Sequence, residues 1–515
     1  MRRAWLLAGA LLALCVGCNG DGGESDGDGP APDAGAPDFS RANLVIISLD
    51  TLRADGLSMG GGPAGISPVL QAFADEGIVF SNARAQAPQT APSHMSLFTS
   101  TYPSVHGVQN VAHEKDEKTG KSRAVIVPLR EDIPTLAEVL AADGFRNIGL
   151  TDGGNLNPPH GFARGFEEYT YDLSGAKAQV NDGIRWVQQL AADDARRFFL
   201  FWHTYQIHAP YVPPEPHMSN WATAKYDGPV KARIEKLAGM DFKQRFGAMR
   251  DVFWKDKESF GWPESAYLHG LYRGEIAYTD KELERLFGVM RSEGVFDDSI
   301  VIVLSDHGEE FFEHGKWQHE QLFEECLRVP LIVRLPGGWG GGRVIKAPVG
   351  LIDVMPTVLD LLDVGPSRTE LSGRIRSHGQ SLAPVLTQTG PVRIRPIISE
   401  HVAMRGGNWT WLVSVEANGA KLIQDQVRGR RLPDGTIEYE RQAYDLGNDR
   451  NENQDISTSG LKRVDALIKL HDAFLAMLAI EGAEEGETAQ LTCDQIEQLI
   501  QLGYMDADDR PDCDD

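Results

Sequence analysis

Short apolar runs alternate with amphipathic stretches from residue 43 onward. Four of the runs are continuous in branched or aromatic residues, as expected of strands covered on both faces: 43–49, 198–202, 300–304 and 331–333. Alternation of strands with helices indicates βαβ units. The sequence therefore predicts an α/β fold with a large, mostly parallel central sheet and helices on both of its faces.

Two of the predicted helices carry start or stop signals. Ser67 and Pro68 are a capping residue and a first-turn proline, and Gly77 ends that helix before a strand at 78–80. Asp280 is predicted to cap a second helix, in which apolar residues recur at helical spacing: Leu283, Leu286, Phe287 and Met290.

The N-terminus has the pattern of an export signal. Arg2 and Arg3 precede an apolar run at 4–16 that is too short to cross a bilayer. The run ends in the letters LCVGC, which resemble a bacterial lipobox with Cys18 as the lipidated residue, although Cys15 stands where Leu is usual. We expect an exported protein that is lipid-anchored to the bacterial cell envelope, at the outer membrane or the periplasmic face. A plain cleaved signal is the alternative.

The chain is predicted to have four segments. Residues 1–18 are a lipoprotein signal peptide, and residues 19–40 are a tether rich in Gly, Asp and Pro that cannot bury apolar surface. Residues 41–390 form the main domain. Residues 391–515 form a smaller α+β subdomain, because the chain becomes more polar after a strand-like run near residues 391–398.

Charge and cysteine content narrow the classes of protein. The formal net charge of −24 over 515 residues argues against nucleic-acid binding, which needs a basic face. An anionic substrate would need a local cation to reverse this field. Cys326 lies in an apolar stretch and is predicted to be a buried thiol, whereas the sequence does not decide whether Cys493 and Cys513 form a disulfide.

Three candidate metal ligands follow predicted strands. Asp50 comes directly after the strand at 43–49, and Asp306 and His307 come just after the strand at 300–304. The carboxyl ends of parallel strands are where α/β sheets bind ligands. Two carboxylates and an imidazole at one rim suit a divalent cation. The alternatives are that Asp50 only caps a helix and that Asp306 and His307 only begin a loop.

Thr90 is a candidate nucleophile. It stands two residues before Pro92, which suits a first helical turn, so Thr90 is expected at a helix N-terminus where amide groups favour a developing oxyanion. A threonine hydroxyl beside a cation can ionise and attack phosphorus or sulfur. The alternative is that Thr90 is only a helix cap.

These segments occur in an order that resembles the sulfatase family of the alkaline phosphatase superfamily. The landmarks are IISLDTLRAD, SPVLQAFADEGIVFSNA, TAPSHMSLFTSTYPSVHGV, HTYQIHAPYVPP, LYRGEIAYTD and SDHGEEFFEHG, followed by LRVPLIV, LIDVMPTVLDLL, HGQSL, AYDLGNDRNE and LGYM. They cover nearly all of the chain after the tether. The resemblance implies an alkaline-phosphatase-like α/β fold and a metal-dependent hydrolase of sulfuric or phosphoric esters.

The resemblance also assigns roles to individual residues. It implies that Asp50, Thr90, Asp306 and His307 hold one divalent cation (Ca, Mg, Mn or Zn), and that Thr90 is the nucleophile. His208 and His319 fall on positions that bind and protonate the ester, and His319 stands where many relatives carry Lys. Arg53 and His94 are weaker candidates for substrate binding, and Arg53 can instead steady the carboxylates. His106, His203 and His314 are expected to be structural and to bond to nearby backbone groups; the alternative is that one of them contacts a ligand residue.

The chain departs from sulfatases at two positions. Sulfatases make a formylglycine from Cys or Ser in the pattern C/S-x-P-S-R, whereas Thr90 and His94 stand at the first and last of these places. Threonine cannot become that aldehyde, so no formylglycine is expected. A threonine nucleophile and a single cation resemble the lipoteichoic acid synthase branch of the superfamily.

Three functions stay open from the sequence. The first is hydrolysis of a phosphate or sulfate ester through Thr90, with phosphorus mildly favoured because the formylglycine pattern is missing. The second is a true (aryl)sulfatase that works without formylglycine. The third is a non-catalytic surface lipoprotein that binds sulfated or phosphorylated glycans. The expected partner is an anionic small molecule, glycan or lipid head group, with no nucleic acid.

Overall fold

A computed structural model describes residues 37–481 except 111, 116–121, 194, 223–224, 366–370, 372–373, 406–407 and 432–436. The described residues from Asp38 onward belong to one compact unit. The predicted signal peptide, nearly all of the tether, and Cys18, Cys493 and Cys513 lie outside the described residues, so those expectations stay predictions. Among the described helices, none has the length and apolar character needed to cross a membrane.

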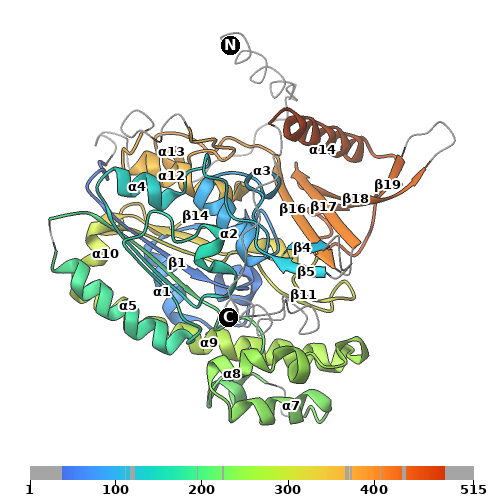
Figure 1. Cartoon of the computed structure of the whole chain (residues 1–515), viewed down its shortest axis with the longest axis horizontal. Coiled ribbons are helices and arrows are strands. Elements are labelled where there is room, and N and C mark those ends of the chain that lie inside the picture. The colour runs from blue at the N-terminus through green and yellow to red at the C-terminus, as the bar shows by residue number, and fades with distance from the viewer. Residues whose placement is uncertain are drawn as a thin grey trace, which may run out of the picture. The chain divides into compact units, whose positions relative to one another are not determined.

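The core is an eight-stranded sheet with the strand order β14-β2-β13-β9-β1-β8-β6-β7. Figure 1 shows this sheet between two layers of helices. Its strands are β1 (Asn43–Leu49), β2 (Ile78–Phe80), β6 (Arg146–Thr151), β7 (Glu168–Tyr171), β8 (Phe198–Thr204), β9 (Ser299–Leu304), β13 (Leu331–Arg334) and β14 (Arg343–Ile345). The predicted runs at 43–49, 78–80, 198–202, 300–304 and 331–333 all form strands of this sheet.

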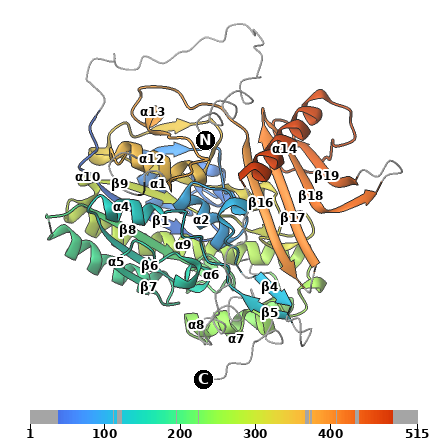
Figure 2. The same ribbon diagram turned by 45° about the horizontal axis from the view of Figure 1, so that its top comes forward.

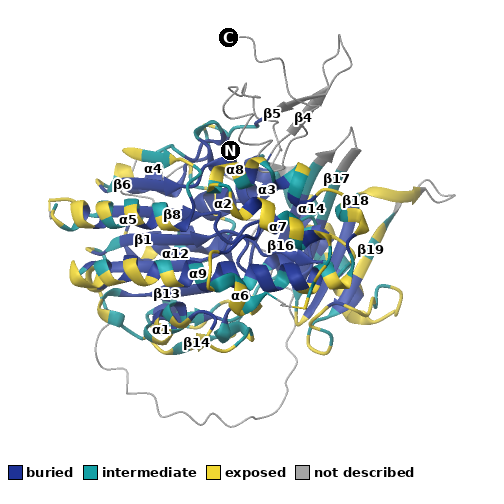
Figure 3. Ribbon diagram, turned by 90° about the horizontal axis from the view of Figure 1, so that it is seen from below, coloured by how far each residue is buried: buried dark blue, intermediate teal, exposed yellow. Residues whose placement is uncertain are grey.

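The sheet is mostly parallel, as predicted. Strand β1 pairs in parallel with β8 on one side and with β9 on the other, and β6 continues the parallel arrangement beyond β8. The direction reverses at β13, which pairs antiparallel with both β9 and β2. The central strands are buried along nearly their whole length (Figure 3). The carboxyl ends of β9, β1 and β8 therefore lie together at one edge.

Helices cover both faces of this sheet. The helices of the main domain are α1 (Pro68–Glu76), α2 (Thr90–Thr99), α3 (Pro103–His106), α4 (Leu136–Ala142), α5 (Ala176–Ala191), α6 (His217–Trp221), α7 (Pro229–Ala238), α8 (Phe242–Gly247), α9 (Trp262–Ser292), α10 (Val295–Asp298), α11 (Glu324–Leu327), α12 (Val354–Leu361) and α13 (Ala383–Leu386). Apolar side chains of α2, α4 and α12 pack with Leu44 and Ile46 of β1, whereas those of α1, α5 and α9 pack with Val45 and Ile47. Alternate residues of β1 thus face opposite helix layers.

The prediction for Asp280 was wrong in an informative way. Asp280 lies inside the 31-residue helix α9 and does not begin it. Its carboxylate instead accepts hydrogen bonds from the backbone amides of Val69 (3.0 Å) and Leu70 (2.8 Å) in the first turn of α1. Ser67, the predicted cap of α1, makes no capping hydrogen bond through its side chain. A residue more than 200 positions away therefore satisfies the amides that start this helix.

The stretch between residues 213 and 257 contains the helices α6, α7 and α8. These helices cover the segment that carries His208, because Phe246 of α8 stacks on the His208 ring with centroids 5.8 Å apart. Residues with helical periodicity such as Val230, Ile234 and Leu237 are buried here. This segment therefore contributes packing as well as surface.

A four-stranded antiparallel sheet and one helix form the C-terminal part. They are β16 (Ile397–Arg405), β17 (Asn408–Ala417), β18 (Ala420–Arg431), β19 (Ile437–Asp445) and α14 (Lys462–Glu481). Helix α14 lies against β17 and β18 (Figure 2). This agrees with the predicted smaller α+β part; the exact boundary at 390/391 stays a prediction.

Three smaller sheets of short strands complete the described fold. A three-stranded sheet contains β3 (Ala83–Arg84), β12 (Arg328–Val329) and β15 (Val349–Gly350), and two hairpins are formed by β4 (Ala112–Lys115) with β5 (Ser122–Val125) and by β10 (Glu310–Phe311) with β11 (Trp317–Gln318). The hairpin β10–β11 follows the predicted metal ligand His307 and leads directly into His319.

Candidate active site

The three predicted metal ligands converge at the carboxyl edge of the sheet. Asp50 follows β1, and Asp306 and His307 follow the neighbouring parallel strand β9. One ligand atom from each of these side chains lies within 4.8 Å of the other two, and all three residues are buried. The strand arrangement predicted from the sequence therefore brings this set together.

The chemistry of this set fits a divalent cation. Asp50 Oδ1 and Asp306 Oδ2 are buried oxygens that accept no hydrogen bond from the described residues. Burial raises the pKa of both carboxyls well above the usual range, and the nearby Asp50 raises that of Asp306 further. His307 Nδ1 lies 2.9 Å from the carbonyl oxygen of Gly308, and donation to it leaves the Nε2 lone pair toward the carboxylates. Two buried oxygens and an imidazole nitrogen without donors are the groups a cation would satisfy.

Thr90 begins helix α2 and faces the metal ligands, as predicted. Its hydroxyl oxygen lies 3.3 Å from Asp50 Oδ2 and 3.4 Å from His307 Nε2. Thr90 is fully buried at the first position of the helix, after Gln89 in an extended conformation. Its hydroxyl is therefore placed between two candidate ligands at a helix N-terminus.

The backbone at Thr51, next to Asp50, is in the left-handed region with a φ of 57°. This region is unfavourable for a β-branched residue. Three contacts hold it: the Thr51 hydroxyl donates to Asp50 O (2.7 Å), Tyr272 donates to Thr51 O (2.8 Å), and the Thr51 amide lies 3.4 Å from Asp306 Oδ1. The strained turn directs Asp50 toward the site.

His208 and His319 come together beside the metal ligands. Their ring centroids are 5.3 Å apart, and the His319 ring is 4.5 Å from the His307 ring. His208 Nδ1 is 2.7 Å from Ala209 O and can donate to this carbonyl. Burial lowers the pKa of His208 to about 4. The two imidazoles predicted to contact the ester thus lie close to the candidate ligands.

Glu309 orients His319, and the sequence reading did not find it. Glu309 Oε1 lies 3.1 Å from His319 Nδ1, and Tyr211 donates to Glu309 Oε2 at 2.7 Å. Burial alone would raise the pKa of Glu309, but the nearby imidazoles and the Tyr211 hydroxyl outweigh it and hold this pKa below its usual value. The signal in the sequence is slight: an acidic residue two positions after His307 in SDHGEE.

Arg53 binds carboxylates in this structure. Its guanidinium is buried and pairs with Asp55 (2.7 Å) and Glu313 (2.6 Å), and it also donates to Glu309 O (3.0 Å). These contacts fit the expectation that Arg53 steadies the acidic residues of the site. They leave its role in substrate binding a prediction.

His94 and His203 lie behind the metal ligands. His94 Nδ1 is 2.9 Å from Thr90 O and 3.4 Å from Asp306 Oδ2, and its Nε2 is 2.9 Å from Ser48 Oγ. This geometry supports a contact that holds Thr90 rather than one with substrate. His203, expected to bond to backbone groups, instead faces a carboxylate, with Nε2 3.2 Å from Asp50 Oδ2.

Two buried amides were also missed. Asn110 accepts from the amide of Ala91, the residue after Thr90, at 2.9 Å, and its Nδ2 has no hydrogen-bond partner among the described residues. Asn155 is fully buried, both of its side-chain polar atoms are unpaired within the described part of the chain, and its backbone amide donates to Tyr205 Oη at 3.3 Å. Buried amides without partners are costly unless a ligand or water satisfies them.

A second cluster of possible ligands contains His314, Glu325 and Glu452. Here basic side chains already supply the positive charge, because Lys421 Nζ lies 2.9 Å from Glu452 Oε1 and Arg84 lies 2.8 Å from Glu324. His314 Nε2 is 3.4 Å from Glu325 Oε2, and this carboxylate raises the pKa of His314 against the effect of burial. We therefore interpret this cluster as an ionic contact, as expected for a structural His314.

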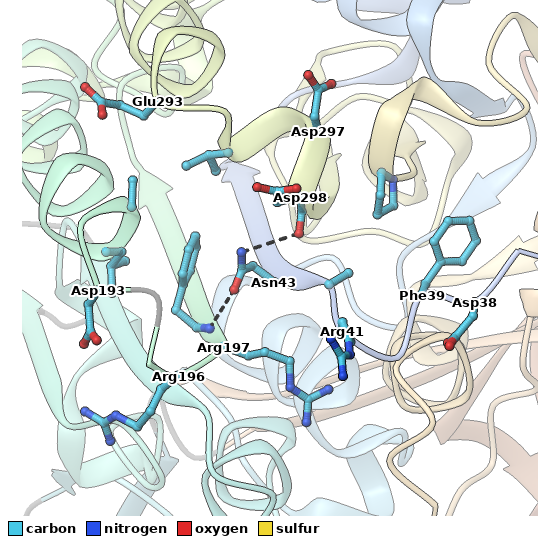
Figure 4. Close-up of a pocket in the computed structure, with 16 residues that line it drawn as sticks. Asp38, Phe39, Arg41, Asn43, Asp193, Arg196, Arg197, Glu293, Asp297 and Asp298 are labelled. Atoms are coloured by element: carbon cyan, nitrogen blue, oxygen red, sulfur yellow. Dashed lines mark hydrogen bonds between the residues drawn. The ribbon is translucent and has the colours of Figure 1, made fainter.

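A cavity of about 380 Å³ lies at the opposite end of the strands. Figure 4 shows Asn43 in its lining, where the side chain accepts from Phe198 N (3.0 Å) and donates to Asp298 O (3.4 Å). Both basic and acidic residues line it, including Arg41, Arg196, Asp193 and Asp297. Because it lies at the amino ends of β1 and β8, it is separate from the candidate active site.

The family is established by comparison with known proteins. A family model described as Sulfatase matches residues 42–364, which is more than half of the chain. The chain therefore belongs to the sulfatase family, within the alkaline phosphatase superfamily. It is a hydrolase of ester bonds.

Individual relatives are distant in sequence, but they align with most of this chain. The chain is 24% identical over 413 residues to the multifunctional alkaline phosphatase superfamily protein PehA of Trinickia caryophylli, with 68% of this chain and 78% of the relative covered. It is 24% identical over 431 residues to a choline-sulfatase of Rhizobium meliloti, with 72% and 78% covered.

Solved structures confirm the fold. A phosphonate monoester hydrolase of Agrobacterium radiobacter aligns with a TM-score of 0.62 at 19% identity, over 86% of this chain and 96% of that one. A protein solved with its substrate D-glucosamine-2-N,6-O-disulfate aligns with a TM-score of 0.63 at 19% identity, over 87% and 100%.

Proposed function

We propose that this protein hydrolyses monoesters or diesters of phosphoric, phosphonic or sulfuric acid, with Thr90 as the nucleophile and one divalent cation at Asp50, Asp306 and His307. The observation that carries the proposal is the position of the Thr90 hydroxyl, 3.3 Å from Asp50 and 3.4 Å from His307, beside two buried carboxylate oxygens that the described residues leave without donors. A relative named as a choline-sulfatase, one named as a multifunctional alkaline phosphatase superfamily protein, and a structural neighbour named as a phosphonate monoester hydrolase support this range of substrates.

When bound, the cation would lower the pKa of the Thr90 hydroxyl and offset the negative charge of the ester. The Thr90 oxygen then forms a bond to phosphorus or sulfur while the bond to the leaving oxygen breaks. The Thr90 proton has an acceptor in Asp50 Oδ2. His208 or His319 gives a proton to the leaving oxygen, and water afterwards cleaves the Thr90 ester and restores the hydroxyl.

The surrounding residues position these groups. Glu309 contacts Nδ1 of His319, and the Ala209 carbonyl contacts Nδ1 of His208, so each ring has a partner that fixes its orientation. The Asn110 side-chain NH₂ group, unpaired among the described residues, is suited to hydrogen-bond a non-bridging oxygen, because it lies beside the first turn of α2. The reacting side chains are at most 3% exposed, which limits their contact with bulk water.

Phosphorus or phosphonate esters are favoured over sulfates. A threonine ester of sulfate can be cleaved only by attack of water, whereas a hydrated formylglycine expels sulfate by breaking its own C–O bond. Thr90 offers no such route. A true sulfatase working through Thr90 is the second candidate, because it fits the family match over residues 42–364.

The test is a paired assay of the protein with added Mn²⁺, Mg²⁺, Ca²⁺ or Zn²⁺ on an aryl sulfate, an aryl phosphate, an aryl phosphonate monoester and a bis-aryl phosphate. Thr90→Ala should lose at least ~10³-fold in turnover, about 4 kcal/mol of transition-state stabilisation. Thr90→Ser is the matched control and should retain measurable turnover. Wild-type rates in Thr90→Ala would exclude the nucleophile, and no turnover of any ester by metal-loaded protein would favour a binding protein.

A further inference from the structure

Glu275 contacts the segment that carries His208 at two places. It lies on α9, is 1% exposed, and is absent from the predicted machinery. Its Oε1 accepts from the amide of Val212 at 2.7 Å, and its Oε2 accepts from Gln206 Nε2 at 2.8 Å. These two donors lie on either side of His208 in the chain. One carboxylate thus ties both ends of this short segment to a long helix.

The hydrogen bonds around Glu275 have a fixed polarity. The amide of Ala176, the first residue of α5, donates to Gln206 Oε1 at 3.0 Å. A backbone amide can only donate, so Gln206 must turn its oxygen to Ala176 and its NH₂ group to Glu275. The amide of Val212, which faces the other oxygen of Glu275, can likewise only donate. Glu275 therefore has to accept on both oxygens, which an ionised carboxylate does and an amide cannot.

The segment from Gln206 to Val212 helps to position both imidazoles. His208 lies inside it, and Tyr211 of the same segment donates to Glu309, which holds His319. Arg245 of α8 adds a further tie by donating to Val212 O at 2.9 Å. A shift of this segment would therefore move His208 directly and His319 through Tyr211 and Glu309.

We propose that Glu275 is a positioning residue, whose carboxylate fixes the segment from Gln206 to Val212 so that His208 and His319 meet the ester in the right orientation. This proposal rests on the proposed function for its kinetic consequence, but not for its structural one. Misplacing a reacting group by about 1 Å can cost ~10²-fold in rate.

Burial makes this arrangement sensitive to pH. Burial raises the pKa of Glu275 to about 8, against its two hydrogen bonds and the facing guanidinium of Arg245, which all lower it. Tyr278, one turn along α9, is a further titratable group near Glu275, and its pKa is raised by burial and by the charges of Glu282 and Glu275. Only the ionised carboxylate accepts on both oxygens. The two hydrogen bonds to Glu275 should therefore form more completely as pH rises through about 8.

The experiment exchanges the side-chain carboxylate at position 275 and the side-chain amide at position 206. In Glu275→Gln, the new NH₂ group meets the NH₂ group of Gln206, so that bond is lost. In Gln206→Glu, two carboxylates face each other. In the double variant, the new carboxylate at position 206 accepts from Ala176 and from the new amide at position 275, whose oxygen still accepts from Val212. Each hydrogen bond of the chain then regains a donor and an acceptor. Glu284→Gln, an exposed acid on the same helix, is the matched control.

Each single variant should lower kcat by ~10–100-fold, as loss of an outer partner typically does, with unchanged metal content. The double variant should recover to within about threefold of wild type, and Glu284→Gln should equal wild type. The rise of kcat with pH near 8 should disappear in Glu275→Gln. Single variants with wild-type kcat, or a double variant no better than the worse single one, would overturn the proposal.

Hydrogen exchange separates this proposal from the proposed function. Peptides covering residues 205–212 should exchange faster in Glu275→Gln than in wild type and return to wild-type rates in the double variant. This readout needs no turnover. If wild-type protein hydrolyses none of the esters, the proposed function fails while the exchange rates still decide whether Glu275 holds the segment; unchanged exchange in Glu275→Gln would reject that.

Discussion

Two buried groups of acids in this protein are neutralised in different ways. At the carboxyl edge of the central sheet, Asp50 and Asp306 pair with no lysine or arginine among the described residues. The side chains nearest to them are imidazoles. Where β3 approaches β18, an ionic cluster instead combines two bases with three acids: Arg84 and Lys421 with Glu324, Glu416 and Glu452. All of these residues are buried.

This difference indicates which buried carboxylates join structural elements and which ones need a bound cation. Acids that the chain pairs with its own cations join elements, as Arg84 of β3 and Lys421 of β18 do with acids from other segments. Acids left without a side-chain cation stay ionised only if something else supplies the positive charge. At the carboxyl edge of the central sheet, the proposed divalent cation would supply that charge to Asp50 and Asp306.

The largest effect, on metal content and turnover, should come from removing one of the proposed metal ligands at the carboxyl edge of the sheet. Asp306→Asn keeps the shape but removes a charge, so bound divalent metal should fall from about one per chain to near zero, with turnover down by at least ~10³-fold. Metal analysis after dialysis and thermal unfolding with and without EDTA measure this. EDTA should lower the Tm of wild type and leave that of Asp306→Asn unchanged; equal metal content in both proteins would move the site elsewhere.

Breaking the ionic cluster should affect stability and spare the metal. Lys421 is 1% exposed, and Lys421→Met leaves the carboxylates of Glu452 and Glu324 without their ammonium. The free energy of unfolding should fall by about 3–5 kcal/mol, measured in urea. Lys281→Met, which breaks an exposed pair with Glu284, is the control and should leave stability unchanged. Loss of bound metal in Lys421→Met would mean that the two groups are coupled.

The smallest expected effect is on how folding stability depends on pH. Burial, together with repulsion from Glu324, raises the pKa of Glu452 to about 7. A carboxyl with a higher pKa in the folded than in the unfolded chain binds its proton more tightly when folded, so its contribution is complete below about pH 4.5 and is lost as pH rises through about 7. Glu452→Gln should therefore lose less stability than wild type between about pH 5 and about pH 7.5. A steeper loss in the variant would contradict the assignment, and EDTA should not alter the comparison.

Strand ends could be predicted, whereas partners could not. The apolar runs identified the central strands, and the rule that parallel strands bring ligands to one edge placed Asp50, Asp306 and His307 together. Thr90 was placed by the proline two residues later. By contrast, His203, Glu309 and Glu275 have no local signature, because their partners come from other segments. Asp280 was misread for the same reason, since a capping residue looks alike whether it caps its own helix or a distant one.

The place of β1 in the strand order has a consequence for synthesis. The first strand of the chain lies between β8 and β9, so both of its neighbours come about 150 or more residues later, and the second is complete only at Leu304. At ribosomal speeds of ~5–20 residues per second, β1 waits roughly ten seconds to a minute for its last neighbour. Folding of this enzyme is therefore a late event, and a nascent chain that stops before Leu304 has an apolar strand with one edge bare.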